Sequence, residues 1–303
     1  MLTILLATAV LGVPTSVQDT LIQVREGDQL VLRDFSGAVE VEGWNRNELR
    51  AEADDEETLF FHFSRSGSRI EMGVRDRKDR NRMEELRLFV PSWMDLEVSG
   101  RELDIEVRGI GGKVLIRNLE GDIILHDLSG EMEVSTVEGS IDARNLRGTA
   151  SLKTGDDDIT VLESSAELEL ESVEGDIELI RSTTLKIDAR TTEGDVEYTG
   201  RLLSEGVYAF HSHGGELTLN LEPPVNADVT VLVYEGEFQS DFPIRAEGYR
   251  SGRDLRFVIG EGGARVLLDA FDGEVRLRRA GSDGEEAEGA GRPPSPLRNP
   301  ATR

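Results

Sequence analysis

The sequence predicts an all-β protein, a right-handed parallel β-solenoid (β-helix) with about 18 residues in each coil. Three observations predict it. Glycines recur at nine-residue intervals, aliphatic residues alternate with polar ones between them, and an acidic phrase returns at every second interval. Helix signals are nearly absent, which leaves strands as the regular structure.

The glycine repeat defines the unit of the predicted fold. Each unit follows the pattern Gly-x-apolar-x-apolar-x-x-apolar-x. Its first two apolar positions place two aliphatic side chains on one face of a strand. A third apolar residue, such as Leu146 or Val173, closes the unit. Nine residues therefore make one strand and one corner, and two such units make one coil. The repeat glycines are Gly112, Gly121, Gly130, Gly139, Gly148 and Gly175. The residues expected in the core include Leu125, Val134, Ile141, Leu170 and Ile177.

One corner of each coil carries the phrase Glu-Gly-Asp or a close variant, as in "SVEGDI" from Ser172. A tight corner favours a residue that tolerates positive φ, so we expect φ near or above zero at Gly139 and Gly175. Parallel crossover connections are almost always right-handed, which gives the expected sense of winding. Near Thr183 the frame gains one residue, and we expect a bulge there.

The domain organisation follows from the extent of this pattern. We predict one β-solenoid domain over residues 19–280, most regular between 101 and 200, with irregular β caps at both ends. The apolar run at the start predicts a signal peptide over residues 1–18, with a buried first strand as the alternative. Residues 281–303 contain several Gly and Pro and few apolar side chains, which predicts a disordered tail.

Composition narrows the classes of partner and the compartment. The formal net charge of −26 argues against nucleic acid and against an anionic membrane surface. The first apolar run is too short for a membrane span, so we expect no span in the mature chain. There are no cysteines, which excludes disulfides and thiolate metal sites. These features favour an exported protein that is periplasmic, secreted or on the cell surface.

The acidic corner is the first candidate site. Carboxylates that recur in neighbouring coils offer the oxygen ligands that Ca²⁺ prefers, and the candidate metal ligands are Asp156, Asp157, Asp158, Glu174 and Asp176. The alternative is a solvated edge that keeps the protein soluble. The spacing lacks the closely spaced glycines of the calcium-binding nonapeptide repeat.

Other chemistry finds less support in the sequence. His211 and His213 would project to the same side of a strand, but a metal site needs a third ligand. The chain has no Gly-x-Ser-x-Gly elbow and no cysteine nucleophile. We therefore expect no catalytic residues and no cofactor.

Four features of the sequence carry a resemblance to a known family: the stacked Gly-Asp-Ile phrases, "DFSGAVEVEGW" at 34–44, "LRLFVPSWMDLEVSG" at 86–100 and "GEGGARVLLDAFDGEVRLRR" at 260–279. In these features the chain resembles a bacterial family of "putative adhesin" domains of unknown function, and it looks related as well to auto-transporter adhesin heads. Trp93, Met94 and the corner at Asp157 depart from the family pattern.

The resemblance implies a non-enzymatic surface protein that presents flat strand faces to an unknown protein or glycan at the cell surface. Two alternatives stay open. One is a carbohydrate-active enzyme on a β-helix scaffold, and the other is a calcium-binding surface protein.

Overall fold

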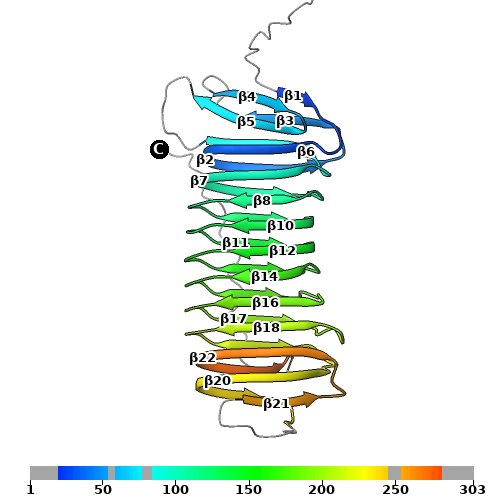
Figure 1. Cartoon of the computed structure of the whole chain (residues 1–303), viewed down its shortest axis with the longest axis vertical. Helices are drawn as coiled ribbons and strands as arrows, with labels where there is room; N and C mark the ends of the chain where they lie inside the picture. The colour runs from blue at the N-terminus through cyan, green and yellow to red at the C-terminus, as the bar shows by residue number, and fades with distance from the viewer. Residues whose placement is uncertain (1–19, 54–58, 77–83, 245–253, 282–303) are drawn as a thin grey trace, which may run out of the picture. The chain divides into compact units, whose positions relative to one another are not determined.

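The computed structural model describes residues 20–53, 59–76, 84–244 and 254–281. All regular structure in these residues is β-strand, as Figure 1 shows, and none of them forms a helix that could cross a membrane. The chain divides into two compact units, Met1–Glu138 and Gly139–Arg303. The predicted signal peptide and residues 282–303 of the predicted tail lie outside the described residues. The single domain over 19–280 stays a prediction.

The first unit combines parallel and antiparallel pairs. The long strand β2 pairs in parallel with β5, β6 and β7, and β7 pairs in parallel with β8 and β9. Antiparallel pairs join β1 to β3, β3 to β6 and β4 to β5. The strands are β1 Thr20–Gln23, β2 Gln29–Trp44, β3 Glu48–Ala53, β4 Leu59–Ser66, β5 Arg69–Asp76, β6 Glu84–Pro91, β7 Asp95–Arg108, β8 Val114–Arg117, β9 Ile123–His126 and β10 Ser129–Ser135.

The second unit contains two stacks of parallel strands. One stack runs β12, β14, β16, β18, β22 and the other runs β11, β13, β15, β17, β19, β22. Strand β20 pairs in parallel with β22 and antiparallel with β21. The strands are β11 Ile141–Arg144, β12 Arg147–Lys153, β13 Ile159–Leu162, β14 Glu167–Glu171, β15 Ile177–Ile180, β16 Lys186–Thr191, β17 Val196–Gly200, β18 Val207–Ser212, β19 Leu217–Leu221, β20 Ala227–Ser240, β21 Asp254–Ile259 and β22 Ala264–Arg279.

The pairing register shows how far the chain advances between stacked strands. Ile141 pairs with Ile159 and Ile159 with Ile177, a step of 18 residues. The next steps are longer, since Ile177 pairs with Val196 and Val196 with Leu217. The extra residue expected near Thr183 is present. It lies in the corner between β15 and β16, because the pairs of β14 and β16 run without a shift, so the predicted strand bulge is wrong.

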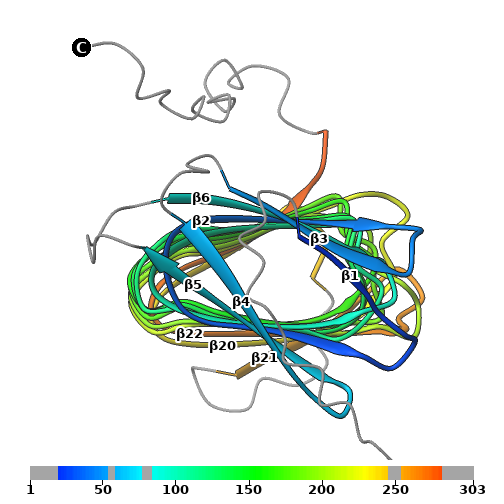
Figure 2. The same cartoon turned by 90° about the horizontal axis from the view of Figure 1, so that it is seen from above.

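The core of the second unit lies between its two stacks, which follow opposite sides of a flattened ring in Figure 2. Side chains alternate between buried and solvent-facing positions along each strand, as the period of two requires. The expected core residues Ile141, Leu170 and Ile177 are fully buried, as are Leu125 and Val134 in the first unit, and this prediction is confirmed. The later coils fill a wider core with the rings of Tyr198, Tyr208 and Phe210.

Candidate functional site

The repeated acidic phrase builds one corner of each coil, here called the glycine corner and exemplified by residues 172–176. Its first residue, Ser172, carries a buried hydroxyl group. Ser172 Oγ accepts the N–H of Gly175 at 3.0 Å and donates to the carbonyl of Asp157 in the preceding coil at 3.2 Å. Thr191 and Ser212 repeat both bonds in the next two coils. The glycine repeat did not point to this hydroxyl group, although Ser or Thr stands three residues before each of these glycines.

The glycine of this corner is required by close approach of two backbones. A Cβ on Gly175 would lie 1.9 Å from the carbonyl oxygen of Asp157, and one on Gly194 would lie 2.2 Å from that of Gly175. Gly139 does adopt a positive φ of 130°, as expected. Gly175 lies outside the left-handed region, so the expected reason for glycine is wrong at this position. The carbonyl of the coil beneath occupies the place of a side chain.

Three of the five candidate metal ligands hydrogen bond to the backbone of a neighbouring coil. Asp157 accepts the N–H of Gly139 at 2.7 Å, and Asp158 accepts that of Asp176 at 2.8 Å. Asp176 in turn accepts the N–H of Asp195 at 2.7 Å. The other two candidates, Asp156 and Glu174, are exposed. Across the described ranges, no group of three or more His, Asp or Glu side chains is arranged to hold a metal ion.

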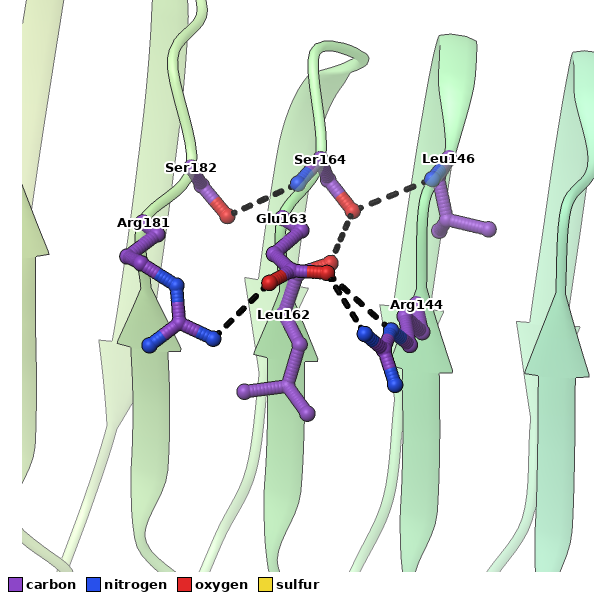
Figure 3. Close-up of polar contacts among 7 residues, drawn as sticks. All are labelled: Arg144, Leu146, Leu162, Glu163, Ser164, Arg181 and Ser182. Atoms are coloured by element: carbon purple, nitrogen blue, oxygen red, sulfur yellow. Dashed lines mark hydrogen bonds and ion pairs between the residues drawn. The ribbon is translucent and has the colours of Figure 1, made fainter.

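The opposite corner, here called the left-handed corner, uses a different device. Asn145, Glu163 and Arg181 recur every 18 residues, and all three have φ between 50° and 53°. None is a glycine, so the sequence pattern did not reveal them. The Glu163 carboxylate lies between two guanidinium groups in Figure 3, 2.8 Å from that of Arg144 and 2.9 Å from that of Arg181. Hydrogen bonds from Arg181 and then Arg144 lower the pKa of Glu163.

A second ladder of hydroxyl groups supports the left-handed corner. Ser164 Oγ accepts the N–H of Leu146 at 3.1 Å and donates to the carbonyl of Leu162 at 3.1 Å (Figure 3). The N–H of Ser164 donates to Ser182 Oγ at 3.4 Å. Both serines are buried, so these bonds satisfy backbone groups that water does not reach. Both corners of the coil are therefore occupied by hydrogen bonds that stack it on its neighbours.

A polar groove lies on the outer face of β17, β19 and β22, in the described part of the second unit. Its volume is about 510 Å³. It is lined by Asp195, Val196, Glu197, Thr199, Glu216, Thr218, Asn220, Arg276, Arg278, Arg279, Ala280 and Gly281. The lining residues come from three stacked strands and the corner beside them. The sequence pattern did not reveal the groove, because it depends on strand pairs that no longer keep the 18-residue step.

The charged groups of the groove bind one another. The Arg276 guanidinium bonds to Glu274 and Glu216, and these bonds raise the pKa of Arg276. Asn220 Nδ2 donates to Glu197 Oε1 at 2.8 Å and to Thr199 Oγ1 at 3.2 Å. The groove thus presents amide and hydroxyl groups between acidic and basic side chains that offset each other.

The two histidines of "FHSHGGE" take separate partners. His211 Nδ1 lies 3.4 Å from Asp269 Oδ2, and the ring of His213 stacks on that of Phe271 with 4.5 Å between centroids. Phe271 also stacks against Tyr234 at 5.7 Å. The two histidines therefore do not share a partner, since His211 lies beside an acid and His213 belongs to a ring stack.

Comparison with solved structures finds several matching chains, with low identity and low TM-scores. A "putative adhesin" from Bacteroides fragilis is 10% identical, with a TM-score of 0.40, over 88% of this chain and 100% of that one. A "putative lipid binding protein" from Parabacteroides distasonis is 9% identical, with a TM-score of 0.39, over 85% and 95%. A "putative adhesin" from the same organism is 11% identical, with a TM-score of 0.34, over 86% and 95%.

Comparison with sequences gives a narrower result. No curated protein matches the chain. Residues 147–278, from the first residue of β12 to the penultimate residue of β22, match the family model described as Toastrack DUF4097. This segment of the second unit, less than half of the chain, is therefore similar to a domain of unknown function.

Proposed function

We propose that the protein is an exported, non-enzymatic, adhesin-like binding module of the cell envelope, whose groove over β17, β19 and β22 holds an uncharged glycan. The chain would wind as a right-handed solenoid of about 18 residues per coil over residues 19–280, after removal of residues 1–18. The observation that carries the proposal is the groove itself, a polar recess of about 510 Å³ on an otherwise regular strand face.

The groove favours binding over catalysis because its acids are engaged by the protein. Asp195 accepts the N–H of Glu216 at 2.7 Å, Glu197 accepts the amide of Asn220, and Glu216 bonds to Arg276. A general acid or base needs a proton position open toward the substrate. Fixed amide and hydroxyl groups, by contrast, suit a ligand with many hydroxyls.

The acids of the glycine corner serve the fold under this proposal. Asp158 and Asp176 act as acceptors for the backbone of the next coil, which explains why an aspartate follows the corner position in both coils. The alternative is that these acids bind Ca²⁺ at the corner.

Binding and hydrolysis can be measured on the same sample. The labelled full-length protein is incubated with insoluble, uncharged polysaccharides, and both its retention and the release of reducing ends are followed. Thr218→Trp places an indole in the groove, and we expect it to weaken retention about tenfold. Thr160→Trp is the matched control, because Thr160 faces solvent on β13 of the same stack, outside the groove.

The outcomes separate the candidate functions. Retention lost only in Thr218→Trp, without reducing ends, supports the proposal. Equal retention of both variants would exclude the groove as the binding site. Reducing ends that disappear in Glu197→Gln would instead identify a carbohydrate-active enzyme.

A further inference from the structure

From residue 172 onward, the second position of the glycine corner is exposed, and its chemistry changes from coil to coil. It holds Val173, which is 48% exposed, and then Thr192 and His213. The same corner recurs in the last coils. There β22 supplies Phe271, 44% exposed, and β20 supplies Tyr234, 43% exposed. This outward position therefore holds valine and threonine in the earlier coils and a ring in each of the last three.

These three rings, His213, Phe271 and Tyr234, are here called the aromatic ladder. Phe271 stacks on His213 with 16° between the ring planes and on Tyr234 with 27°. Aromatic residues are only 5% of the chain, and most of a soluble protein's large apolar groups are buried. Exposed apolar groups that touch one another, rather than lying singly, mark interaction surfaces.

Carboxylates lie on both sides of the aromatic ladder. Asp269 precedes it on β22 and pairs with His211. Asp272 and Glu235 follow it, both are exposed, and they face each other across the pair of β22 and β20. A partner that covers the rings would therefore bring its own charged groups beside these acids, and positive charges are favoured there.

We propose that the aromatic ladder docks a basic segment of another protein, with an apolar side chain against the rings and Lys or Arg beside Asp272 and Glu235. The occupant is a peptide rather than a sugar, because sugar rings stack on aromatic faces and both faces of Phe271 are covered by neighbouring rings. The rim of the stack still offers apolar contact, which aliphatic side chains accept. The surface is separate from the groove residues, so the two proposals stand or fall independently.

The test uses full-length protein and three synthetic peptides in fluorescence anisotropy. One alternates Lys and Leu, one alternates Lys and Ser, and one alternates Glu and Leu. We expect the Lys-Leu peptide to bind at least about tenfold more tightly than either control, and added salt to weaken it. Phe271→Ser should remove that preference. Val173→Ser, at the same corner position but remote from the rings, should keep it.

A fold check accompanies each variant, since Phe271 also stacks within the ladder. Should Phe271→Ser unfold, the pair Tyr234→Ser and Asp272→Asn replaces it, and either change should weaken Lys-Leu binding. Equal binding of the Lys-Leu and Lys-Ser peptides would overturn the proposal in favour of non-specific attraction to an acidic protein. Self-association of the protein that Phe271→Ser abolishes would overturn it in favour of a second copy as occupant.

Discussion

The two corners of each coil in the second unit turn the chain in different ways. At the glycine corner, residue 175 must lack a side chain, because the carbonyl of Asp157 lies where its Cβ would be. At the left-handed corner, Glu163 and Arg181 keep their side chains and adopt a conformation that costs an ordinary residue roughly 1–2 kcal/mol. Lack of space for a Cβ determines the residue at the glycine corner, whereas residues at the left-handed corner keep a side chain in spite of backbone strain.

The difference shows what the repeated glycines signify. At Gly175 and Gly194, the glycine marks a place where two coils approach too closely for a Cβ. Positive φ alone does not demand one, because the side chains of the left-handed corner point to solvent and form ion pairs there. The glycine of the acidic phrase recurs where close approach excludes a Cβ, as at Gly175 and Gly194, whereas Asp157 holds the same corner position in the coil before Gly175.

The largest effect should come from filling the glycine corner. Gly175→Ala places a methyl group against the Asp157 carbonyl, and the backbone must shift to admit it. We expect a loss of at least about 2 kcal/mol in the free energy of unfolding, at the upper end of overpacking costs. Urea denaturation measures it.

The matched change at the left-handed corner should leave the free energy of unfolding almost unchanged. Arg181→Gly relieves a φ of 50° and loses one exposed ion pair to Glu163, two terms that nearly cancel. We expect stability within about 1 kcal/mol of the parent. Equal losses in Gly175→Ala and Arg181→Gly would contradict the distinction between the corners.

Removal of the buried hydroxyl group at the glycine corner should cause the next largest loss of stability. Ser172→Ala leaves the Gly175 N–H and the Asp157 carbonyl without their partner, which costs about 1–3 kcal/mol. Ser172→Thr should be nearly neutral, because Thr154 and Thr191 occupy the same position in adjacent coils. Thermal unfolding of both variants decides the point, and a Thr variant as unstable as the Ala variant would show that packing, not the hydroxyl, matters there.

The sequence predicted most of the fold because its information is local. Alternation identified buried residues such as Ile141 and Leu170, and the step between glycines matched the pairing of Ile141 with Ile159. The apolar residue that closes each nine-residue unit was ambiguous, since Leu146 is buried at one corner while Val173 is exposed at the other. Sequence spacing does not distinguish these corners, because both carry one apolar residue after the strand.

The candidate groove and the aromatic ladder could not be predicted from the repeat pattern, for a physical reason. Both form where successive coils lengthen, so which residues become neighbours depends on corners of unequal length. Thr218 lies beside Glu197 only because the step there is 21 residues, and Phe271 meets His213 across 58 residues of chain. No fixed period connects such residues.

A smaller effect concerns pH at the left-handed corner. Arg181 and Arg144 hold the pKa of Glu163 below its ordinary value of 4.5, so the folded state favours the carboxylate. This contribution is present above pH 4.5 and is lost as the pH falls through the lowered pKa. Glu163→Gln should therefore melt below the parent at pH 7, and the difference should narrow on acidification. A difference that is constant from pH 7 to pH 3 would exclude this ion pair as its cause.

The central claim is that the acids of the glycine corner stabilise the fold and do not bind a cation. The effect of Ca²⁺ on the unfolding temperature tests this claim most directly, and it should be the smallest of the effects predicted. Unfolding temperatures are compared in CaCl₂ and in NaCl at equal ionic strength, for the parent and for a variant with Asp156→Asn and Glu174→Gln. These two acids are exposed and lie outside the Asp158–Asp176 hydrogen bonds. We predict the same small rise in both salts and in both proteins, from screening alone. A rise specific to Ca²⁺, equivalent to about 2.7 kcal/mol at a hundredfold excess over Kd and lost in the variant, would contradict the account.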